Sequence, residues 1–196
     1  MKKHSILRLL TMVTLFVSAI LFFSSCQQDD AIGAQELPIT TRSTPPDVPS
    51  TLVVGEGFEV SCHVYADGYQ VYVCTETAPG VYAWVFKEPI ATLYANAGFN
   101  GVVGTHYVGP TWESNSGSKV GGVRIDGATV DPNAIPWLLL GGVNPQGPGI
   151  FEGTTHIQRV NTVGGKAPAA STANASTVGD EAYIPYTAEY YFYTPE

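Results

Sequence analysis

From about residue 51 to the end of the chain, hydrophobic and polar residues alternate in short runs. Alternation with a period of two predicts β-strands that bury one face. The clearest runs are FEVSCHVYA (58–66), YQVYVCTE (69–76), TTHIQRVNTV (154–163) and YIPYTAEYYFY (183–193). The run IPWLLLG (135–141) is apolar almost throughout, which predicts a strand buried on both faces.

Gly- and Pro-containing turn signals separate these runs. They lie at 67–68, 79–80, 100–101, 109–110, 115–117, 141–142, 147–149 and 164–165. A short helix is conceivable only at 88–95 (EPIATLYA). Many short strands and no long helical period predict an all-β single domain, either an antiparallel sandwich or a small barrel.

The last predicted strand carries aromatic side chains on both faces. Tyr186, Tyr190 and Phe192 share one face, and Tyr191 and Tyr193 share the other. Because large apolar side chains need cover, we expect both faces of this strand to be buried.

The N-terminal segment predicts export. Residues 1–25 have a basic start and the apolar run LLTMVTLFVSAILFF, which is typical of a signal peptide. FSSC (23–26) resembles a bacterial lipobox, which implies a lipid on Cys26 and a partner in the membrane. The alternative is an ordinary signal peptide with an incidental cysteine. Residues 26–50 are polar and contain four prolines, which predicts an extended linker before a domain at 51–196.

The residues after Cys26, Gln27-Gln28-Asp29-Asp30, resemble the surface-export signal of Bacteroidetes lipoproteins. That resemblance implies an outer-membrane lipoprotein of the cell envelope, exposed at the cell surface. The alternative is a solvated, charged start of the linker.

The chain is acidic, with a formal net charge of −8. Removal of residues 1–25 takes away Lys2, Lys3 and Arg8 and leaves 6 basic and 17 acidic residues, a net charge of −11. Nucleic-acid partners need a basic surface, so we predict none. No G-x-G-x-x-G follows a predicted strand, so no dinucleotide cofactor is predicted either.

Cys62 and Cys74 flank a predicted hairpin, CHVYADGYQVYVC (62–74). Exported thiols tend to pair. A three-residue loop at 67–69 would place the two side chains opposite each other, whereas a two-residue turn would point them to opposite faces. The disulfide therefore stays open.

The stretch THYVGPTWE (105–113) gathers the residue types that build sites. In a structural interpretation, His106 donates to a backbone carbonyl, Trp112 fills the core and Glu113 pairs with Lys119. In a functional interpretation, His106 is a base or ligand that the Glu113 carboxylate orients.

Arg159 is a third catalytic candidate, mid-strand beside Gln158. An arginine among apolar neighbours is costly unless its charge is paired. Its natural partners are Glu113, Asp126 or a substrate anion.

A metal site would need His63, His106 and His156 to converge, since three histidines can hold a catalytic zinc. No zinc-binding spacing such as H-E-x-x-H supports this, so we predict no metal and no other cofactor.

A binding function is favoured by the aromatic content. All three Trp and eleven Tyr lie after residue 51, and aromatic faces stack on sugars and apolar ligands. The candidate binding residues are Tyr107, Trp112, Gln158 and Tyr186. Coplanar exposed rings would favour binding of a glycan or protein partner, whereas a deep polar pocket that holds His106 and Arg159 would favour an enzyme.

Four long motifs appear in order: HYVGPTWE (106–113), AIPWLLL (134–140), IQRVNTVGG (157–165) and YTAEYYFY (186–193). Over 52–193 the chain resembles a family of secreted bacterial and fungal proteins of unknown function. The resemblance implies an exported β-rich domain. Relatives often have a Gly-Cys pair shortly after the Gly-Gly-x-Ala-Pro element, where this chain has AASTANAST (169–177). If that cysteine pairs with Cys74 in relatives, Cys74 does otherwise here.

The leading hypothesis is thus a lipid-anchored envelope protein whose β-domain binds a glycan or a small molecule. The alternatives are a small hydrolase or lyase that uses His106 and Glu113, with or without a metal, and a structural envelope protein.

Overall fold

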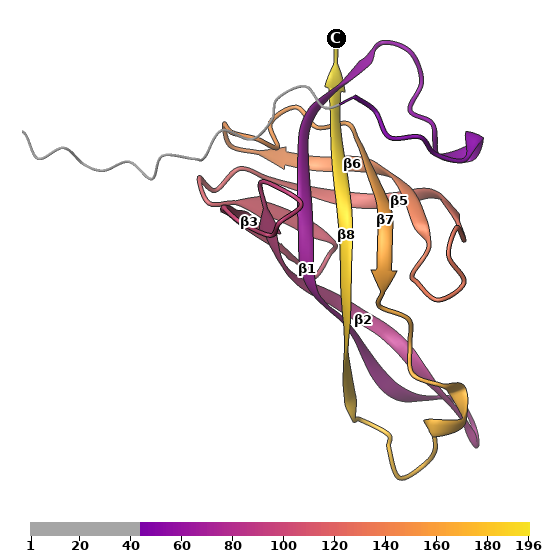
Figure 1. Ribbon diagram of the computed structural model, residues 1–196. Helices are drawn as coiled ribbons and strands as arrows, with labels where there is room; N and C mark the ends of the chain where they lie inside the picture. Colours follow the sequence, from indigo (N-terminus) through magenta and orange to yellow (C-terminus); the bar gives the residue numbers. More distant parts are fainter. Residues whose placement is uncertain (1–43) are drawn as a thin grey trace, which may run out of the picture. The chain divides into compact units, whose positions relative to one another are not determined.

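A computed structural model of the protein describes residues 44–196 (Figure 1). The predicted signal peptide, the lipidation site Cys26 and most of the predicted linker lie outside the described residues. Within residues 44–196, no helix has the length and apolarity needed to cross a membrane.

The described part of the chain forms a closed antiparallel barrel. Each strand pairs with the next along the chain, and β1 also pairs with β8. The predicted all-β class is confirmed, with the barrel rather than the sandwich as its architecture. The elements are η1 (Ser50–Leu52), β1 (Phe58–Ala78), β2 (Val81–Tyr94), β3 (Val102–Tyr107), β4 (Thr111–Ser114), β5 (Lys119–Ala128), β6 (Trp137–Gln146), β7 (His156–Gly164), η2 (Ala170–Thr172) and β8 (Glu181–Pro195).

The two longest strands that close the barrel, β1 and β8, run side by side (Figure 1). Their pairing runs from Phe58↔Pro195 to Val73↔Glu181. Alternate side chains of both strands point inward, so Val64 faces the interior beside Tyr190. The inner cluster fills part of the barrel with Trp112, Phe151, Phe192 and Leu93, all essentially without solvent exposure.

The outer face of β8 has a cover of its own. Tyr191 and Tyr193 are buried in a second cluster with Val60 and Val160, and Val48 and Val54 pack against it. The expectation that both faces of this strand are buried is therefore confirmed. Val48 precedes the predicted domain start at 51, so the end of the predicted linker packs on the barrel.

Two predicted turns are absent, and the short helix considered at 88–95 does not form. Residues 88–95 continue strand β2 instead of forming a helix, and residues 141–142 lie within β6 instead of a turn. No hairpin forms at Asp67-Gly68, because β1 runs straight through it. Gly68 serves a close approach of strands here, since a Cβ at this position would lie 2.1 Å from the carbonyl oxygen of Ile90.

The straight course of β1 also decides the open question of the disulfide, which does not form. Cys62 and Cys74 lie on one strand, and twelve residues of strand span about 40 Å, far beyond the ~7 Å that a disulfide allows between Cα atoms. Both side chains are buried. Cys74 Sγ lies 3.3 Å from Thr177 Oγ1, so the segment 169–177 lies against Cys74.

Candidate functional site

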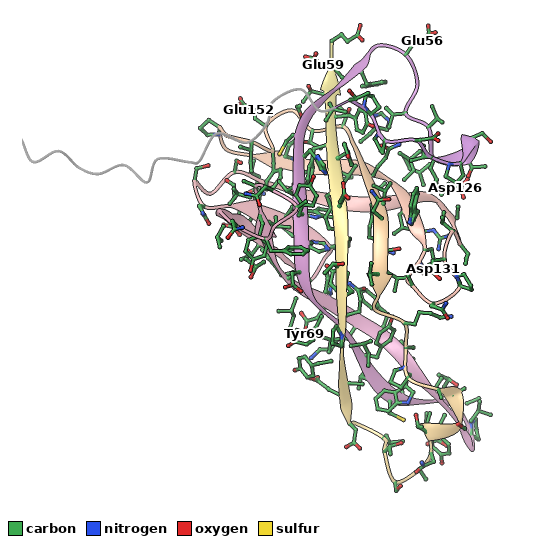
Figure 2. All side chains as sticks on the ribbon, viewed as in Figure 1. Glu56, Glu59, Tyr69, Asp126, Asp131 and Glu152 are labelled. Carbon is green, nitrogen blue, oxygen red and sulfur yellow. The ribbon has the colours of Figure 1, made fainter. Side chains whose placement is uncertain are left out.

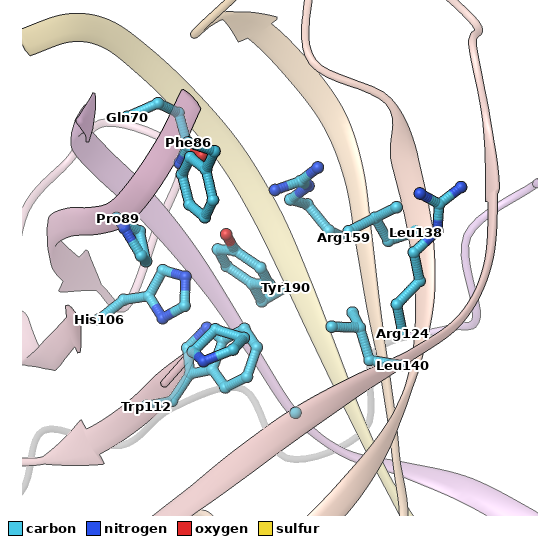
Figure 3. Close-up of a pocket in the computed structure, with 12 residues that line it drawn as sticks. Gln70, Phe86, Pro89, His106, Trp112, Arg124, Leu138, Leu140, Arg159 and Tyr190 are labelled. Carbon is cyan, nitrogen blue, oxygen red and sulfur yellow. The ribbon is translucent and has the colours of Figure 1, made fainter. Parts of the chain in front are cut away.

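A cavity of about 310 Å³ lies inside the barrel (Figure 3). Every strand contributes to its wall, which places the cavity in the barrel interior and not between surface loops. The lining residues are Gln70, Phe86, Pro89, His106, Pro110, Trp112, Gly122, Arg124, Leu138, Leu140, Arg159 and Tyr190. Eight-stranded barrels are just wide enough to hold either packed side chains or one small ligand.

The inner end of the cavity is an aromatic wall. The His106 and Trp112 rings stack with centroids 4.3 Å apart, and Tyr190 meets both rings edge to face at 5.2 Å. The register explains this contact, because His106 and Trp112 are directly opposite on β3 and β4 and so point to the same face. Gly122 leaves the space that Trp112 occupies, since a Cβ there would lie 2.8 Å from its ring.

His106 is held as a neutral imidazole. Its Nδ1 lies 2.8 Å from the carbonyl oxygen of Thr111. A carbonyl only accepts, so Nδ1 carries the proton and Nε2 keeps its lone pair. Burial lowers the pKa of His106 to about 3, and the charge of Arg159 acts in the same direction. At neutral pH the cavity therefore presents an acceptor at His106.

Glu113 does not orient His106. It pairs with Thr105 across β3 and β4, one position out of step with His106, and so points to the outer face. There the Tyr107 hydroxyl donates to Glu113 Oε2 at 2.6 Å and Lys119 Nζ lies 3.2 Å from Oε1. The hydrogen bond from Tyr107 and the contact with Lys119 lower the pKa of this carboxyl. The three contacts of the structural interpretation are thus present, and the predicted His106–Glu113 pair is absent.

Arg159 reaches into the cavity from β7, half-buried. Its Nε and Nη2 donate to the carbonyl oxygen of Pro136 at 3.2 and 2.9 Å. Within residues 44–196 neither Glu113 nor Asp126 pairs with it, and Arg124 on β5 forms no ion pair either. Of the partners predicted for Arg159, both carboxylates are therefore excluded in the described structure.

Several buried polar atoms around the cavity have no hydrogen-bond partner among the described residues. They are Gln70 Nε2, Trp112 Nε1, Tyr190 Oη and, next to them, Tyr186 Oη. Burial raises the pKa values of the Tyr186 and Tyr190 hydroxyls. The two hydroxyls also lie close enough to influence each other, and Arg159 influences both. No contact among them has the geometry of a full hydrogen bond, and buried polar groups in this state call for an explanation.

The predicted binding residues separate into two groups. Trp112 lines the cavity, and Tyr186 lies in the inner cluster beside it. Tyr107 faces outward and bonds Glu113. Gln158 is buried on the opposite side of β7 from Arg159, where Nε2 donates to the carbonyl oxygen of Leu52 at 2.6 Å.

Sequence reasoning missed Gln70, Phe86, Arg124 and Tyr190 as members of one site. They lie on strands β1, β2, β5 and β8. Only the closure of the barrel brings these strands around a common interior, and no local motif signals it.

The three histidines do not converge. His63 stacks on Tyr191 on the outer face and its Nε2 lies 2.9 Å from Glu189 Oε2. His156 meets Phe58 edge to face. Over the described range, no group of three or more His, Cys, Asp or Glu side chains is placed to hold a metal ion.

Among residues 44–196, the exposed rings of Tyr69 and Tyr183 do not form a flat platform. Tyr69 and Tyr183 lie on the outer face of neighbouring strands, where Figure 2 shows Tyr69 outside the ribbon. Their rings are 6.2 Å apart at 79°, edge to face rather than coplanar. A stacking surface for sugars needs faces that point the same way, so the interior cavity is the stronger binding site.

Fold and site together define an eight-stranded antiparallel barrel with a ligand-sized interior cavity. The family model described as "Protein of unknown function (DUF3455)" matches residues 55–194, and the chain belongs to that family. The resemblance to a family of unknown function is thereby confirmed. Neither a curated protein nor a solved structure matches the chain.

Proposed function

We propose that this protein binds a small molecule inside its barrel. The observation that carries the proposal is the cavity of about 310 Å³, walled by all eight strands, whose buried polar atoms lack protein partners. Ligand pockets are mostly apolar with a few convergent polar groups, and range from about 300 to 1,000 Å³. Trp112, Leu138 and Leu140 supply the apolar surface, and Arg159, Tyr190 and Gln70 the polar groups.

The proposal includes the place where the protein acts. A lipid on Cys26 tethers the domain at the cell envelope, and the proline-rich segment after it holds the barrel away from the membrane. Cys26→Ser then moves the protein from the membrane fraction to the soluble fraction. A variant that lacks the lipid and stays with the membranes contradicts this part of the proposal.

A hydrolase or lyase that acts through His106 is the second candidate, because the cavity does hold both His106 and Arg159. Among the described residues that line the cavity there is no carboxylate and no Ser or Cys nucleophile. A histidine whose pKa is about 3 is also a weak base at neutral pH. Binding is therefore the better-supported function.

The test is a thermal-melt screen of the Cys26→Ser chain against small amphipathic acids, alcohols and sugars. A ligand at a hundredfold excess over its dissociation constant stabilises the fold by about 2.7 kcal/mol. Leu138→Trp occupies part of the cavity, and we expect it to abolish the shift. Val123→Trp introduces the same side chain at an exposed position of neighbouring strand β5 and leaves the shift intact. A shift that persists in Leu138→Trp would place binding elsewhere, and no shift with any compound would favour a structural envelope protein.

A further inference from the structure

We infer that the ligand of this cavity is a small carboxylate with an apolar body, and that Arg159 binds its carboxylate. This inference rests on the proposed binding function and adds the chemical class of the ligand. Four observations carry it: the distribution of positive charge, the free edge of the Arg159 guanidinium, the excess of hydrogen-bond donors and the apolar remainder of the wall.

Positive charge is scarce in the described part of the chain, and both of its arginines line the cavity. The described range 44–196 contains five basic residues, of which only Arg124 and Arg159 are arginines, and both line the cavity. Lys87 and Lys119 pair with glutamates on the outer surface, and Lys166 donates to a backbone carbonyl. The cavity is thus a positive site inside an acidic chain, with no carboxylate in its wall to neutralise it.

The guanidinium of Arg159 has one edge left for a ligand. Arginine has five N–H donors. Nε and Nη2 each use one on the carbonyl oxygen of Pro136. Among the described residues the N–H groups across Nη1 and Nη2 form no full hydrogen bond, although the guanidinium lies close enough to Tyr190 to lower the pKa of its hydroxyl. Two parallel N–H groups match the two oxygens of a carboxylate. Figure 3 shows this guanidinium extending toward the side where the Tyr190 hydroxyl lies.

Apart from the acceptor at His106 Nε2, the unpartnered polar atoms of the cavity can all act as donors. Gln70 Nε2 and Trp112 Nε1 can only donate, and Tyr190 Oη can donate to an anion. Each of the three side chains is at most 2% exposed, so a small shift of these side chains is needed before water or a ligand reaches the three atoms. An acceptor-rich ligand group relieves this surplus, and an ionised carboxylate accepts hydrogen bonds without donating any.

The rest of the wall sets the character of the ligand body. Phe86, Pro89, Leu138 and Leu140 are apolar, and the His106–Trp112 stack forms a flat face. Phe86 and Arg124 line the cavity and are also exposed, so they mark its opening. The volume equals about ten waters at their share of the liquid. A short alkyl chain or a single ring attached to the carboxylate fits this space.

The experiment compares matched acids and alcohols by calorimetry on the Cys26→Ser chain. The probes are ω-phenylalkanoates with two to six methylene groups and the corresponding ω-phenylalkanols. We expect at least one acid to bind tenfold or more tightly than its alcohol. Arg159→Met brings the acid down to the affinity of the alcohol and leaves the alcohol unchanged. Lys87→Met removes the same charge outside the cavity and preserves the preference.

The outcomes separate the two levels of the proposal. Equal binding of acid and alcohol, unaffected by Arg159→Met, would overturn the anionic class and leave a binding barrel. No binding by any member of the series would overturn both. If Arg159→Met does not fold, Arg159→Lys tests the role of Arg159 instead. Lysine keeps the charge but lacks the two parallel N–H groups. We therefore expect the preference for the acid over the alcohol to fall at least threefold. An unchanged preference in Arg159→Lys would overturn the role assigned to Arg159.

Discussion

Both faces of β8 carry buried tyrosines, but among the described residues the tyrosine hydroxyls are hydrogen-bonded on one face and unpaired on the other. On the outer face the Tyr193 hydroxyl donates to Gln158 Oε1 at 2.6 Å, and Gln158 in turn donates to the carbonyl oxygen of Leu52. On the inner face the Tyr186 and Tyr190 hydroxyls are as deeply buried and have no full hydrogen bond among the described residues. Both faces are aromatic and closed to water, yet only the outer one is internally satisfied.

This difference distinguishes architecture from a site. A complete buried network stabilises one conformation, because breaking any member leaves the others unpaired. Unsatisfied buried donors lower stability, and proteins that keep them have a reason to do so. The outer face thus has the chemistry of a structural seam that attaches residues 48–54 to the barrel. The inner face has the chemistry of a site that a ligand completes.

The largest expected effect is a loss of folding stability at acidic pH, which arises from His106 inside the barrel. Unfolded histidine titrates at 6.5, whereas folded His106 titrates at about 3. Between these values the unfolded state binds the extra proton, so stability falls as the pH drops from 6.5 toward 3, by up to about 5 kcal/mol. Urea unfolding across this range measures the loss. His106→Asn keeps a donor near Thr111 but cannot titrate, so its stability depends less steeply on pH. Equal slopes in both proteins would contradict the neutral, buried state of His106.

A second variant breaks the outer face. Gln158→Ala leaves the Tyr193 hydroxyl and the Leu52 carbonyl without partners, and each such buried group costs about 1–3 kcal/mol. We expect the free energy of unfolding in urea to fall by about 3 kcal/mol, with acid binding unchanged in protein that remains folded. Asn161→Gly removes an exposed hydrogen bond from the same strand, fits the left-handed backbone of this position and serves as the control, with a loss within about 0.5 kcal/mol. A loss of acid affinity in Gln158→Ala would show that the two faces are not independent.

A matched pair of hydroxyl deletions compares the faces directly. Tyr193→Phe leaves Gln158 Oε1 without its hydrogen-bond donor and lowers the free energy of unfolding by about 1–2 kcal/mol. Tyr190→Phe removes an oxygen that has no partner, so stability stays the same or rises by up to about 1 kcal/mol, while the affinity for the acid falls. Urea unfolding and calorimetry give both numbers. If Tyr190→Phe were as destabilising as Tyr193→Phe, the inner hydroxyl would have a protein partner after all.

Much of this fold follows from local pattern, and the exceptions share a cause. Alternation predicts the strands, and glycines with left-handed backbone, such as Gly80 and Gly117, mark true turns. Gly68 and Gly142 look the same in the sequence but lie within strands, because neighbouring backbone leaves no room for a Cβ. Whether a glycine serves a turn or a close approach depends on which strands meet there, and that is tertiary information.

The candidate site shows the same limit. His106, Trp112 and Arg159 stand out by residue type and do line the cavity. Their partners could not be predicted, because the pairing of β1 with β8 joins residues more than a hundred positions apart. The functional interpretation pairs Glu113 with His106 because the two are near in sequence, but a one-residue offset in register turns Glu113 to the other face.

The smallest expected effect is that of Glu113→Gln, which tests whether Glu113 belongs to the outer face. Glu113→Gln removes the charge of a surface carboxyl whose pKa is lowered by Tyr107 and Lys119. Because the pKa is lower in the folded state, ionised Glu113 stabilises the fold at pH values above the ordinary pKa of a carboxyl. This stabilisation is lost as the pH falls through the pKa of the folded state. Because the pair is partly exposed and screened by salt, we expect a loss below about 1 kcal/mol at neutral pH, and a smaller one at high salt. The measurement is urea unfolding at two salt concentrations, together with calorimetry of the acid series. Acid affinity stays unchanged if Glu113 belongs to the outer surface. A marked loss of affinity would instead couple Glu113 to His106 and revive the hydrolase hypothesis that the register argues against.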